Sequence, residues 1–530
     1  MFEVSLDVGL SWLASDDNHR LIANGLRGLE KECLRVDRKG RLATTPHSRR
    51  WGAALTHPWI TTDYSEALLE FVTPPFDRNE TTLQFLAELH AFVAQSASDE
   101  LLWPASMPCI VGADESVPIA DYGPSNDGRL RSIYRSGLGY RYGRAMQAIA
   151  GTHFNFSLPR TLWPAWRERF GGDRSLRALQ SDALMGLARN FRRYGWLLTY
   201  LYGASPAFCK SFRRDGHPRL ESLNEGTWYA PHSTSLRMSD MGYRNSTQAR
   251  LALSLNSLDE YLEQLAAALT TVDPHYQAIG VCVDGEYRQL NANLLQLENE
   301  YYSSIRPKPA DKSPRLIAAL AAHGVGYVEV RTLDLNPFEP FGVAVGQLRL
   351  TELLLLYCLL TASPPLSDRE RAEIDQRELI VAWEGRRPAV RVPRDGGAVG
   401  LSGWAAELVE ELGRIAPLLE GERGLYRAAL AEAATAAADP GATLSARVLD
   451  ALAGRSFFDW TMELAERYRE QYLAHVFRAG RLEELRLAAI ESLAAADALE
   501  NSDEPPFSRF LEEFLASGIE KRTESTFHDV

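Results

Sequence analysis

Cysteine is scarce in this chain and forms no metal-binding pattern. The five cysteines among 530 residues lie far apart, and none belongs to a CxxC pair. A disulfide framework and a cysteine-ligated zinc site both require a closer spacing, so neither is indicated. The first residues also lack the basic stretch that begins a signal peptide. We therefore expect the protein to work in the reducing environment of the cytoplasm.

Long hydrophobic runs and clusters of basic residues are lacking as well. The most apolar run, at 353–360, is much shorter than the roughly 20 residues that span a membrane, so we expect a buried helix there. The net charge is −13, and no block of Lys and Arg occurs. Nucleic acids and anionic membrane surfaces both select clustered cations. We expect neither as a partner and favour small-molecule substrates.

The sequence has no phosphate-binding loop. No GxxxxGK[ST] segment occurs, and GLGYRYG at 137–143 lacks the spacing of a dinucleotide-binding fingerprint. Any ATP must therefore be held by metal ions and by single cations rather than by a glycine-rich loop. The candidates for such cations are Arg135, Arg237 and Arg331.

Three apolar stretches, GLEKECLRV, GTHFNFSL and VGYVEVRTL, each place two polar side chains two residues apart. The pairs are Glu30 with Glu32, His153 with Asn155, and Glu329 with Arg331. A spacing of two is the period of a β-strand, so each pair shares one face of its strand while apolar residues take the other face. The pattern predicts three strands whose polar faces point into a site.

Asp63 and Glu70, in TTDYSEALLEF, add two acidic side chains to this set. Together with the three strands they offer five carboxylates and one imidazole that can converge. Like charges repel strongly in a medium of low dielectric, and each buried carboxylate loses its hydration, so such a site requires cations. Divalent ions, most simply Mg²⁺, would balance the charge and bind a phosphorylated substrate. The sequence thus predicts metal-dependent phosphoryl chemistry.

Each of these residues also has an ordinary structural interpretation. The two glutamates of the first stretch could lie on a solvated edge strand, and Glu329 with Arg331 could form an ion pair on a wet sheet face. His153 could be a hydrogen-bonded core histidine, and Asp63 could cap a helix. We favour the metal site because a multi-metal site predicts that all of these residues in one chain point away from solvent.

Neighbouring tyrosines and arginines form a second group of candidates. They are Tyr134 with Arg135, Arg237 with Tyr243, and Tyr302 with Arg306. A guanidinium beside a phenol hydroxyl suits the α-carboxylate of an amino-acid substrate. A surface arginine beside a packed tyrosine is the alternative for each pair.

The composition of the chain changes near residue 340. Residues 1–340 contain short alternating strands with irregular connections, which favours an α+β fold with a largely antiparallel sheet. Residues 341–530 are dominated by Ala, Leu, Glu and Arg at helical spacing. We expect a catalytic sheet region with helices at 1–340 and a helical region at 341–530 that packs on it and is not independent. Turn-rich breaks are expected at 385–400, 439–442 and 500–506.

Taken in order, these segments resemble the proteobacterial glutamate–cysteine ligase family over about residues 20–480. The matching stretches are GLEKECLRV, LTHPWITTDYSEALLEF, WPASMP, YGPSNDGRLRSIYRSGL, RYGRAMQAIAGTHFNFSLP, YLYGASPA, TSLRMSDMGY, LQLENEYYSSIRPK, EVRTLDLNPF and TLSARVL. The resemblance implies a glutamine-synthetase-like fold, in which an antiparallel sheet curls into a funnel around Mg²⁺ and ATP. It also implies that ATP phosphorylates the γ-carboxylate of L-glutamate and that L-cysteine displaces the phosphate. The product would be γ-glutamylcysteine, in the first step of glutathione biosynthesis.

The resemblance also implies roles for individual residues. The ligands of Mg²⁺, or of Mn²⁺ in its place, would be Glu30, Glu32, Asp63, Glu70, His153 and Glu329. Arg331 would contact the transferred phosphoryl group and would act with Glu329 in catalysis. The glutamate-binding set would be Gln147, Ile149, Asn155 and Arg237, and the cysteine-side set would be Tyr134, Arg135, Tyr243 and Tyr302. Tyr64 stands where relatives often carry Phe, which adds a hydroxyl near the expected thiol pocket.

Two other functions stay open at this stage. Another ligase of the same fold could join glutamate to ammonia or to a different amine, and the acceptor pocket would decide between them. The second is a regulator that binds metal and nucleotide without turnover, although intact candidates at every ligand position argue against it. Our expectation is a monomeric enzyme that acts on ATP, L-glutamate and L-cysteine.

Overall fold

The computed structural model describes residues 5–15, 18–96, 99–108, 110–213, 215–242, 251, 253–311, 313, 315–419 and 424–518. At the centre of this part lies a seven-stranded sheet in the order β11-β12-β5-β1-β3-β2, with β4 paired to β1. Every neighbouring pair is antiparallel. The strands are β1 (Leu26–Val36), β2 (Ile60–Thr62), β3 (Leu68–Val72), β4 (Leu101–Leu102), β5 (Gly151–Ser157), β11 (Ile305–Lys308) and β12 (Tyr327–Asp334). Strands β1, β5 and β12 confirm the three strands expected from the two-residue spacing.

Helices make up most of the remaining chain. Up to residue 340 they are α1 (Leu6–Ala14), α2 (Arg20–Ala23), α3 (Asn79–Ser96), α4 (Asn126–Tyr142), α5 (Leu162–Trp166), α6 (Leu176–Tyr194), α7 (Trp196–Tyr202), α8 (Leu258–Thr270), α9 (Pro274–Ile279) and α10 (Leu316–His323). Later helices are α11 (Val345–Leu360), α12 (Asp368–Glu384), α13 (Leu401–Gly413), α14 (Ala416–Leu419), α15 (Leu425–Ala438), α16 (Leu444–Leu452), α17 (Phe457–Ala474), α18 (Arg481–Glu500) and α19 (Phe507–Ala516). Together with the antiparallel sheet they confirm the expected α+β fold and its mostly helical C-terminal half.

Short elements complete the architecture. Single turns of 3-10 or π-helix lie at Arg49–Trp51, Asp114–Ser116, Met146–Ala148, Arg167–Gly171, Glu298–Glu300 and Pro440–Ala442. Small sheets are formed by β6 (Ala207–Cys209), β7 (Glu221–Asn224) and β8 (Thr227–Tyr229), by β9 (Cys282–Val283) with β10 (Glu286–Tyr287), and by β13 (Arg391–Arg394) with β14 (Gly397–Gly400). The last hairpin lies inside the expected break at 385–400. Its turn residues Asp395 and Gly396 have φ of +51° and +77°, and an Asp-Gly pair is a known signal for such a turn.

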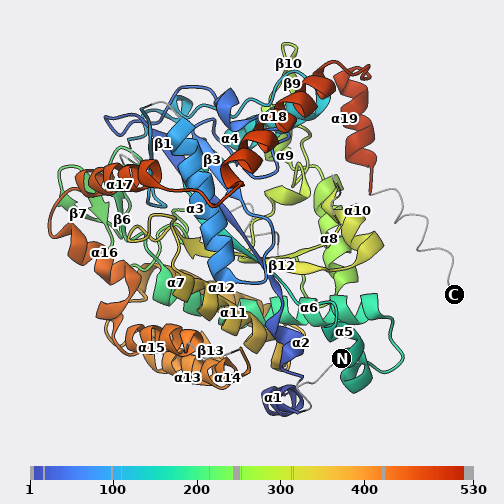
Figure 1. The fold of residues 1–530 in the computed structure, drawn as a ribbon, viewed down its shortest axis with the longest axis vertical. Coiled ribbons are helices and arrows are strands. Elements are labelled where there is room, and N and C mark those ends of the chain that lie inside the picture. The colour runs from blue at the N-terminus through green and yellow to red at the C-terminus, as the bar shows by residue number, and fades with distance from the viewer. Residues whose placement is uncertain are drawn as a thin grey trace.

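One face of the central sheet is mostly apolar and is covered by helices, although Lys31 of β1 also lies on it, with its Nζ atom 2.9 Å from Nε2 of His90 on α3. The fully buried side chains of this face include Cys33, Phe154, Phe156, Val328 and Val330. Helix α3 packs against β1 and β3, α6 against β11 and β12, and α7 against β12. Figure 1 shows α3, in blue, crossing in front of β1 and β3. Because these helices cover the apolar face, the polar face of the sheet can line a site.

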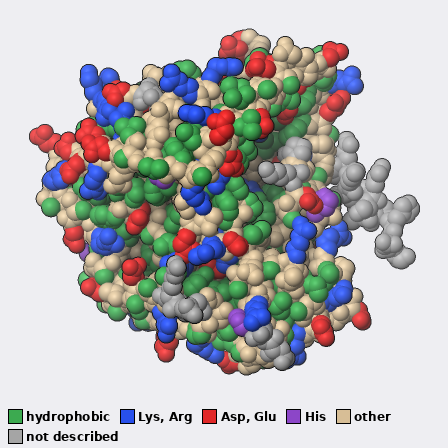
Figure 2. All heavy atoms as spheres, in the orientation of Figure 1, with side chains coloured by type: hydrophobic (Ala, Val, Ile, Leu, Met, Phe, Trp, Pro, Cys, Tyr) green, Lys and Arg blue, Asp and Glu red, His purple; other side chains and the backbone are tan. Residues whose placement is uncertain are grey.

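The later helices return to the sheet region. Helices α11, α17 and α18 each pack against α3, which itself covers the sheet. The lack of independence of the helical region and its boundary near residue 340 both stay predictions. On the face drawn in Figure 2, basic and acidic side chains are mixed rather than separated by sign. No helix among the described residues is long and apolar enough to cross a membrane.

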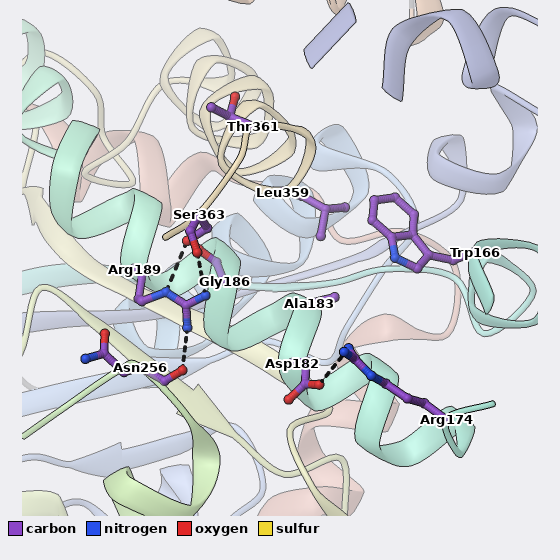
Figure 3. A pocket seen from close by; sticks show the side chains of 10 residues that line it. All are labelled: Trp166, Arg174, Asp182, Ala183, Gly186, Arg189, Asn256, Leu359, Thr361 and Ser363. Carbon is purple, nitrogen blue, oxygen red and sulfur yellow. Dashed lines mark hydrogen bonds and ion pairs between the residues drawn. The ribbon is translucent and has the colours of Figure 1, made fainter. Parts of the chain in front are cut away.

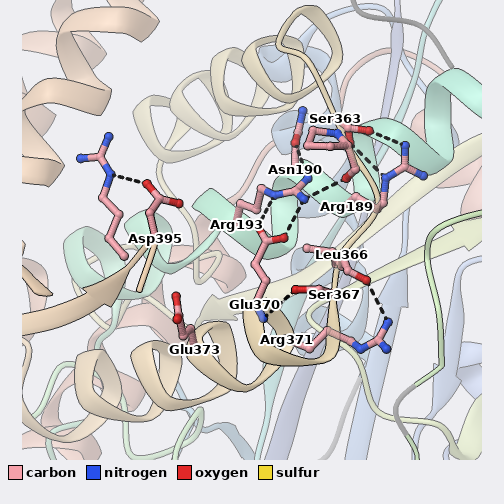
Figure 4. A network of polar contacts seen from close by, with 12 residues as sticks. Arg189, Asn190, Arg193, Ser363, Leu366, Ser367, Glu370, Arg371, Glu373 and Asp395 are labelled. Carbon is pink, nitrogen blue, oxygen red and sulfur yellow. Dashed lines mark hydrogen bonds and ion pairs between the residues drawn. The ribbon is translucent and has the colours of Figure 1, made fainter. Parts of the chain in front are cut away.

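Helix α11 confirms the buried helix expected for the apolar run. It is buried on all sides, as a helix without a polar stripe must be. Its last carbonyl groups lack partners within the helix and need donors. Asn190 on α6 donates through Nδ2 to the carbonyls of Cys358 and Thr361, each at 2.9 Å. One turn later Arg193 pairs with Glu370, which ties the start of α12 to the same point (Figure 4).

His57 holds the turn before β2 and links stability to pH. Its Nδ1 atom accepts hydrogen bonds from the backbone N–H groups of Trp59 at 3.0 Å and Ile60 at 2.9 Å. Burial lowers the pKa of His57 to about 4, and a protonated Nδ1 cannot accept either bond. An unfolded histidine has a pKa of about 6.5, so the unfolded state binds the proton first as the pH falls. The native state therefore loses up to about 3 kcal/mol between pH 6.5 and pH 4.

Replacing His57 with Asn should weaken this pH dependence. The Asn oxygen can accept bonds from the same two N–H groups, but the side chain does not titrate. We expect the unfolding free energy of the wild type to fall by about 2 kcal/mol more than that of His57→Asn between pH 7 and pH 4.5. Urea titrations at several pH values measure the difference. If the unfolding free energies of the wild type and of His57→Asn differed by the same amount at every pH in this range, His57 would not be the cause of acid sensitivity.

Candidate active site

The polar faces of β1, β3 and β5 lie side by side in the sheet. Glu30 is directly opposite His153 in the β1–β5 pair, and Glu32 is directly opposite Glu70 in the β1–β3 pair. The Nδ1 atom of His153 lies 3.3 Å from Oε2 of Glu30, and its Nε2 atom lies 3.9 Å from Oε1 of Glu32. The backbone N–H of Gly151 donates to Glu32 at 2.7 Å. The alternation of each strand therefore brings these side chains onto one surface.

Glu329 on β12 joins this surface from the other side of β5. Its Oε1 atom lies 3.9 Å from Nδ1 of His153. One ligand atom from each of Glu30, His153 and Glu329 lies within 4.8 Å of the others, close enough to share one cation. Glu329 is fully buried and has cationic partners: Lys308 Nζ at 2.9 Å and a contact with Arg331. A buried carboxylate needs such partners to stay charged.

Asp63 comes from the turn that follows β2, and Arg135 on α4 holds this turn. Arg135 donates through Nε to the carbonyl of Asp63 and through Nη2 to that of Thr62, the latter at 3.3 Å. The guanidinium carbon lies 4.5 Å from the centre of the Tyr122 ring, whose hydroxyl donates to the same Thr62 carbonyl at 2.7 Å. In this structure Arg135 positions the Asp63 turn. A direct contact of Arg135 with substrate stays a prediction.

These side chains line a cavity of about 490 Å³, a size suited to a small molecule. The predicted site residues along it are Glu30, Glu32, Asp63, Tyr64, Glu70, Tyr134, Arg135, Gln147, His153, Tyr302, Arg306, Glu329 and Arg331. One wall is α4, which contributes side chains three or four residues apart from Asp127 to Leu138. A second wall comes from residues 297–302. The cavity therefore gathers segments that are far apart in the sequence.

The remaining predicted residues are Ile149, Asn155 and Arg237, which lie outside the cavity lining, and Tyr243, which lies outside the described residues. Arg237 is fully buried, with Nη1 3.6 Å from Oδ1 of Asp334. Its Nη2 donates at 3.0 Å to the carbonyl of Arg331, so it contacts the backbone of a cavity residue. Asn155 donates through Nδ2 to Oε1 of Glu30 at 2.9 Å and orients that carboxylate.

The acidic residues of the cavity differ in how readily they ionise. Burial and neighbouring acidic groups raise the pKa of Glu32 to about 8, and they raise the pKa of Glu70 well above its ordinary value. Burial also opposes the ionisation of Glu329, but Lys308 and Arg331 outweigh it and hold the pKa of Glu329 well below its ordinary range. The cavity thus holds more carboxylates than its own cations can neutralise. A divalent ion would balance this excess.

Tyr64 presents a buried hydroxyl at the cavity. Its side chain is 1% exposed and lines the cavity. Within the described part of the chain its Oη atom has no hydrogen-bond partner. A buried polar group without a partner costs roughly 1–3 kcal/mol, so this hydroxyl is a candidate for contact with a bound molecule.

Lys308 is a site residue that the sequence did not single out. It lies on β11 two residues after Arg306, whose Nη1 atom is 3.9 Å from Oε1 of Glu329. Arg306 and Lys308 therefore repeat the two-residue spacing that marks the other pairs. Pro307 between them weakens the signal, because proline removes a donor from a strand and argues against a central position.

A second cavity of about 250 Å³ lies beside α6 and the end of α11 (Figure 3). Arg189 lines it, but its Nη1 donates to the carbonyl of Leu255 and its Nη2 to that of Ser363, each at 2.8 Å. Arg174 and Asp182 pair with each other at 3.1 Å. These charged groups already bind protein partners, so this cavity lacks the unbalanced charge of the first one.

A comparison with known families covers most of the chain and all six predicted ligand positions. Residues 10–381 match the model of the family described as glutamate-cysteine ligase. The chain belongs to the glutamate–cysteine ligase family. The resemblance found in the sequence is thereby confirmed.

Other members of the glutamate–cysteine ligase family match along nearly the whole chain. The glutamate–cysteine ligase of Pseudomonas paraeruginosa is 45% identical over 513 residues, which covers 96% of this chain and 97% of that protein. The one from Shewanella oneidensis is 46% identical over 480 residues, 90% of this chain and 92% of that protein.

Solved structures extend the glutamate–cysteine ligase relationship to the fold. The crystal structure of the enzyme from Francisella tularensis in complex with AMP has a TM-score of 0.88 at 32% identity, and covers 95% of this chain and 99% of that one. A bifunctional glutathione synthetase from Pasteurella multocida has a TM-score of 0.68 at 25% identity, and covers 90% of this chain but 56% of that one.

Proposed function

We propose that the protein joins the γ-carboxylate of L-glutamate to the amine of L-cysteine. ATP phosphorylates the γ-carboxylate, and the cysteine amine displaces phosphate from γ-glutamyl phosphate, which yields γ-glutamylcysteine, ADP and phosphate. This reaction is the first step of glutathione biosynthesis, and the proposal places it in the cytoplasm. The observation that carries it is the Glu30–His153–Glu329 cluster, in the cavity of a chain whose relatives are named glutamate–cysteine ligase.

Mg²⁺, or Mn²⁺ in its place, fits the donor set of the cavity. We propose as ligands Glu30, Glu32, Asp63, Glu70, His153 and Glu329. When bound, Mg²⁺ neutralises phosphate oxygens of ATP and so stabilises charge on the transferred group. The protein keeps the ligands oriented: the N–H of Gly151 bonds Glu32, and the amide of Asn155 bonds Glu30.

Arg331 and Lys308 supply fixed positive charge beside the ligands. Both line the cavity and both contact Glu329. A guanidinium can bind two oxygens of a phosphoryl group at once, whereas an ammonium acts as a point charge. In our proposal Arg331 contacts the transferred phosphoryl group, and Glu329 holds Arg331 in position before the substrate binds.

Two sets of residues would hold the amino-acid substrates. For L-glutamate we propose Gln147, Ile149, Asn155 and Arg237, and for L-cysteine Tyr134, Arg135, Tyr243 and Tyr302, with Tyr64 nearby. The buried Oδ1 atom of Asn155 has no hydrogen-bond donor among the described residues, which supports a role in binding. Arg135 contributes through the Asp63 turn that it holds. An acyl phosphate reacts readily with water, so the cavity must exclude solvent and hold cysteine ready for ligation to be faster than hydrolysis.

ADP release tests this proposal and its alternatives in one assay. With ATP and Mg²⁺, we expect slow release of ADP in the presence of L-glutamate alone and much faster release when L-cysteine is added. Faster release with ammonia or another amine than with cysteine would identify a different carboxylate–amine ligase. Absence of release with every amine would identify a regulator without turnover.

Tyr64→Phe is expected to narrow the preference for L-cysteine over 2-aminobutyrate, in which a methyl group replaces the thiol. A pocket without a dedicated thiol partner distinguishes the transition states of such near-isosteres by only about 1–3 kcal/mol. The Tyr64 hydroxyl is the polar group that we expect near the thiol. We expect the ratio of the two kcat/KM values to fall by up to about 10-fold, without loss of thermal stability.

Tyr122→Phe is the matched control, because the Tyr122 hydroxyl already donates to Thr62 and Tyr122 is not among the described residues that line the cavity. It should lower Tm and leave the acceptor ratio unchanged. An unchanged ratio in Tyr64→Phe would mean that Tyr64 does not face the acceptor side chain.

A further inference from the structure

The C-terminal helix α19 packs against the α4 wall of the cavity. Phe507 and Leu511 of α19 are buried in one apolar cluster with Leu130 of α4, and Tyr134 of α4 packs against the same cluster. Figure 1 shows α19, in red, at the end of the molecule where α4 lies. Helix α19 lies beyond the residues 10–381 that match the family model.

Polar contacts fix α19 at both of its ends. Before the helix, Glu504 accepts a hydrogen bond from the backbone N–H of Asn126 at 2.7 Å, and the carbonyl of Pro505 accepts one from the Asn126 side chain at 2.8 Å. Asn126 begins α4. At the other end Arg315 donates to the carbonyl of Phe514 at 2.6 Å, a group without a partner inside the helix. The helix therefore has a defined position on α4.

Arg315 also connects α19 to the second wall of the cavity. Its Nε atom lies 2.9 Å from Oε1 of Glu298, and the two residues are 2% and 5% exposed. Breaking a buried pair of this kind leaves a buried charge without a partner, so the pair holds its two segments together. Glu298 begins a turn from which Asn299 and, further on, Tyr302 line the cavity. Helix α19 thus packs on one cavity wall and is linked through Arg315 to the other.

Phe514 extends from α19 into the lining of this cavity. We propose that Phe514 sets the size limit of the acceptor pocket and so selects an amino acid with a small side chain. The inference rests on the proposed function, because it assigns Phe514 to the side where Tyr134 and Tyr302 would hold the acceptor. An aromatic ring that is fixed by packing excludes a larger substrate side chain by steric contact, and its removal admits one.

Phe510 offers a matched control within the same helix. Its ring is stacked 6.0 Å from that of Phe514, and both side chains are partly buried against the same cluster. Among the described residues that line the cavity, Phe514 is present and Phe510 is not. Truncation of either ring removes similar packing, but only that of Phe514 opens the cavity wall. The two variants therefore distinguish an effect on acceptor specificity from an effect on folding stability.

We expect Phe514→Ala to raise the KM for L-cysteine about 10-fold while the KM values for L-glutamate and ATP stay within about twofold. The kcat/KM for 2-aminopentanoate should rise about 10-fold relative to that for cysteine, because the added side-chain carbons now have room. Phe514→Leu, which retains apolar packing, should shift both values in the same direction and keeps the test valid if the Ala variant unfolds. Phe510→Ala should lower Tm and leave acceptor preference unchanged.

Equal acceptor preferences in the Phe514 and Phe510 variants would overturn the proposal. A larger effect on the KM for glutamate or ATP would also overturn it, because Phe514 would then face a different substrate. If the wild type used another amine in place of cysteine, the proposed function would be wrong. The acceptor preferences of the Phe514 and Phe510 variants, measured with that amine, would then still test the role of Phe514. A wild type that turned over no amine would overturn both.

Discussion

Glu329→Gln is expected to lower kcat by about 10³-fold. The Glu329 carboxylate is fully buried and contacts Lys308 and Arg331. Gln preserves the shape of the side chain but removes the charge that a divalent ion and these two cations require. Glu30→Gln should have a similar effect, because both carboxylates lie beside His153. The rate of ADP release at saturating ATP, Mg²⁺ and amino acids measures kcat.

Glu352→Gln is the matched control for this prediction. Glu352 is equally buried and pairs with Arg27, but it lies on α11 and is not among the described residues of the cavity lining. Its replacement should lower Tm with little change in kcat. Removal of divalent ions by EDTA should abolish wild-type activity, and Mg²⁺ or Mn²⁺ should restore it. Full activity in metal-free buffer, or equal loss of kcat in the two Gln variants, would contradict the proposed metal site.

The strand-borne part of the cavity can be predicted from the sequence because its signal is local. The two-residue spacing of Glu30 and Glu32 in GLEKECLRV belongs to one strand, so their shared face of β1 follows from the spacing alone, whereas the spacing does not predict that Lys31 between them is buried on the other face. The partner of each residue is not a local property. That Glu32 lies opposite Glu70 depends on the register between β1 and β3. Before the fold is known, the sequence includes Glu70 only among the carboxylates that can converge, and the family resemblance then implies that it is a ligand.

Contacts between distant segments do not follow from such patterns. The pairing of Tyr134 with Arg135 predicts two substrate contacts, yet α4 directs Arg135 toward the carbonyls of Thr62 and Asp63. The sequence around Arg135 does not indicate which backbone carbonyls its guanidinium will bond. The approach of Phe514 to the cavity likewise depends on how α19 docks on α4, which is settled by packing and not by the helical pattern of α19.

Arg331→Lys is expected to lower kcat by about 10²-fold while the KM for L-glutamate changes little. Arg331 contacts Glu329, and its guanidinium carbon lies 5.7 Å from the centre of the Tyr302 ring. Lys keeps the positive charge that attracts anionic substrates, but it loses the planar fork that binds two phosphoryl oxygens together. An interaction that becomes strong only as charge develops in the transition state acts on kcat more than on KM.

Arg306→Lys distinguishes this loss from a general effect of replacing a buried arginine. Arg306 also lines the cavity and lies near Glu329, but its Nη2 atom donates to the backbone carbonyls of Asn299 and Tyr301 at 3.2 and 2.7 Å. Its replacement should therefore lower Tm more than kcat. If Arg331→Lys instead raised the KM for ATP and left kcat unchanged, Arg331 would bind ATP in the ground state and would not stabilise the transition state specifically. The contact with the transferred phosphoryl group would then belong to Lys308, which also bonds Glu329.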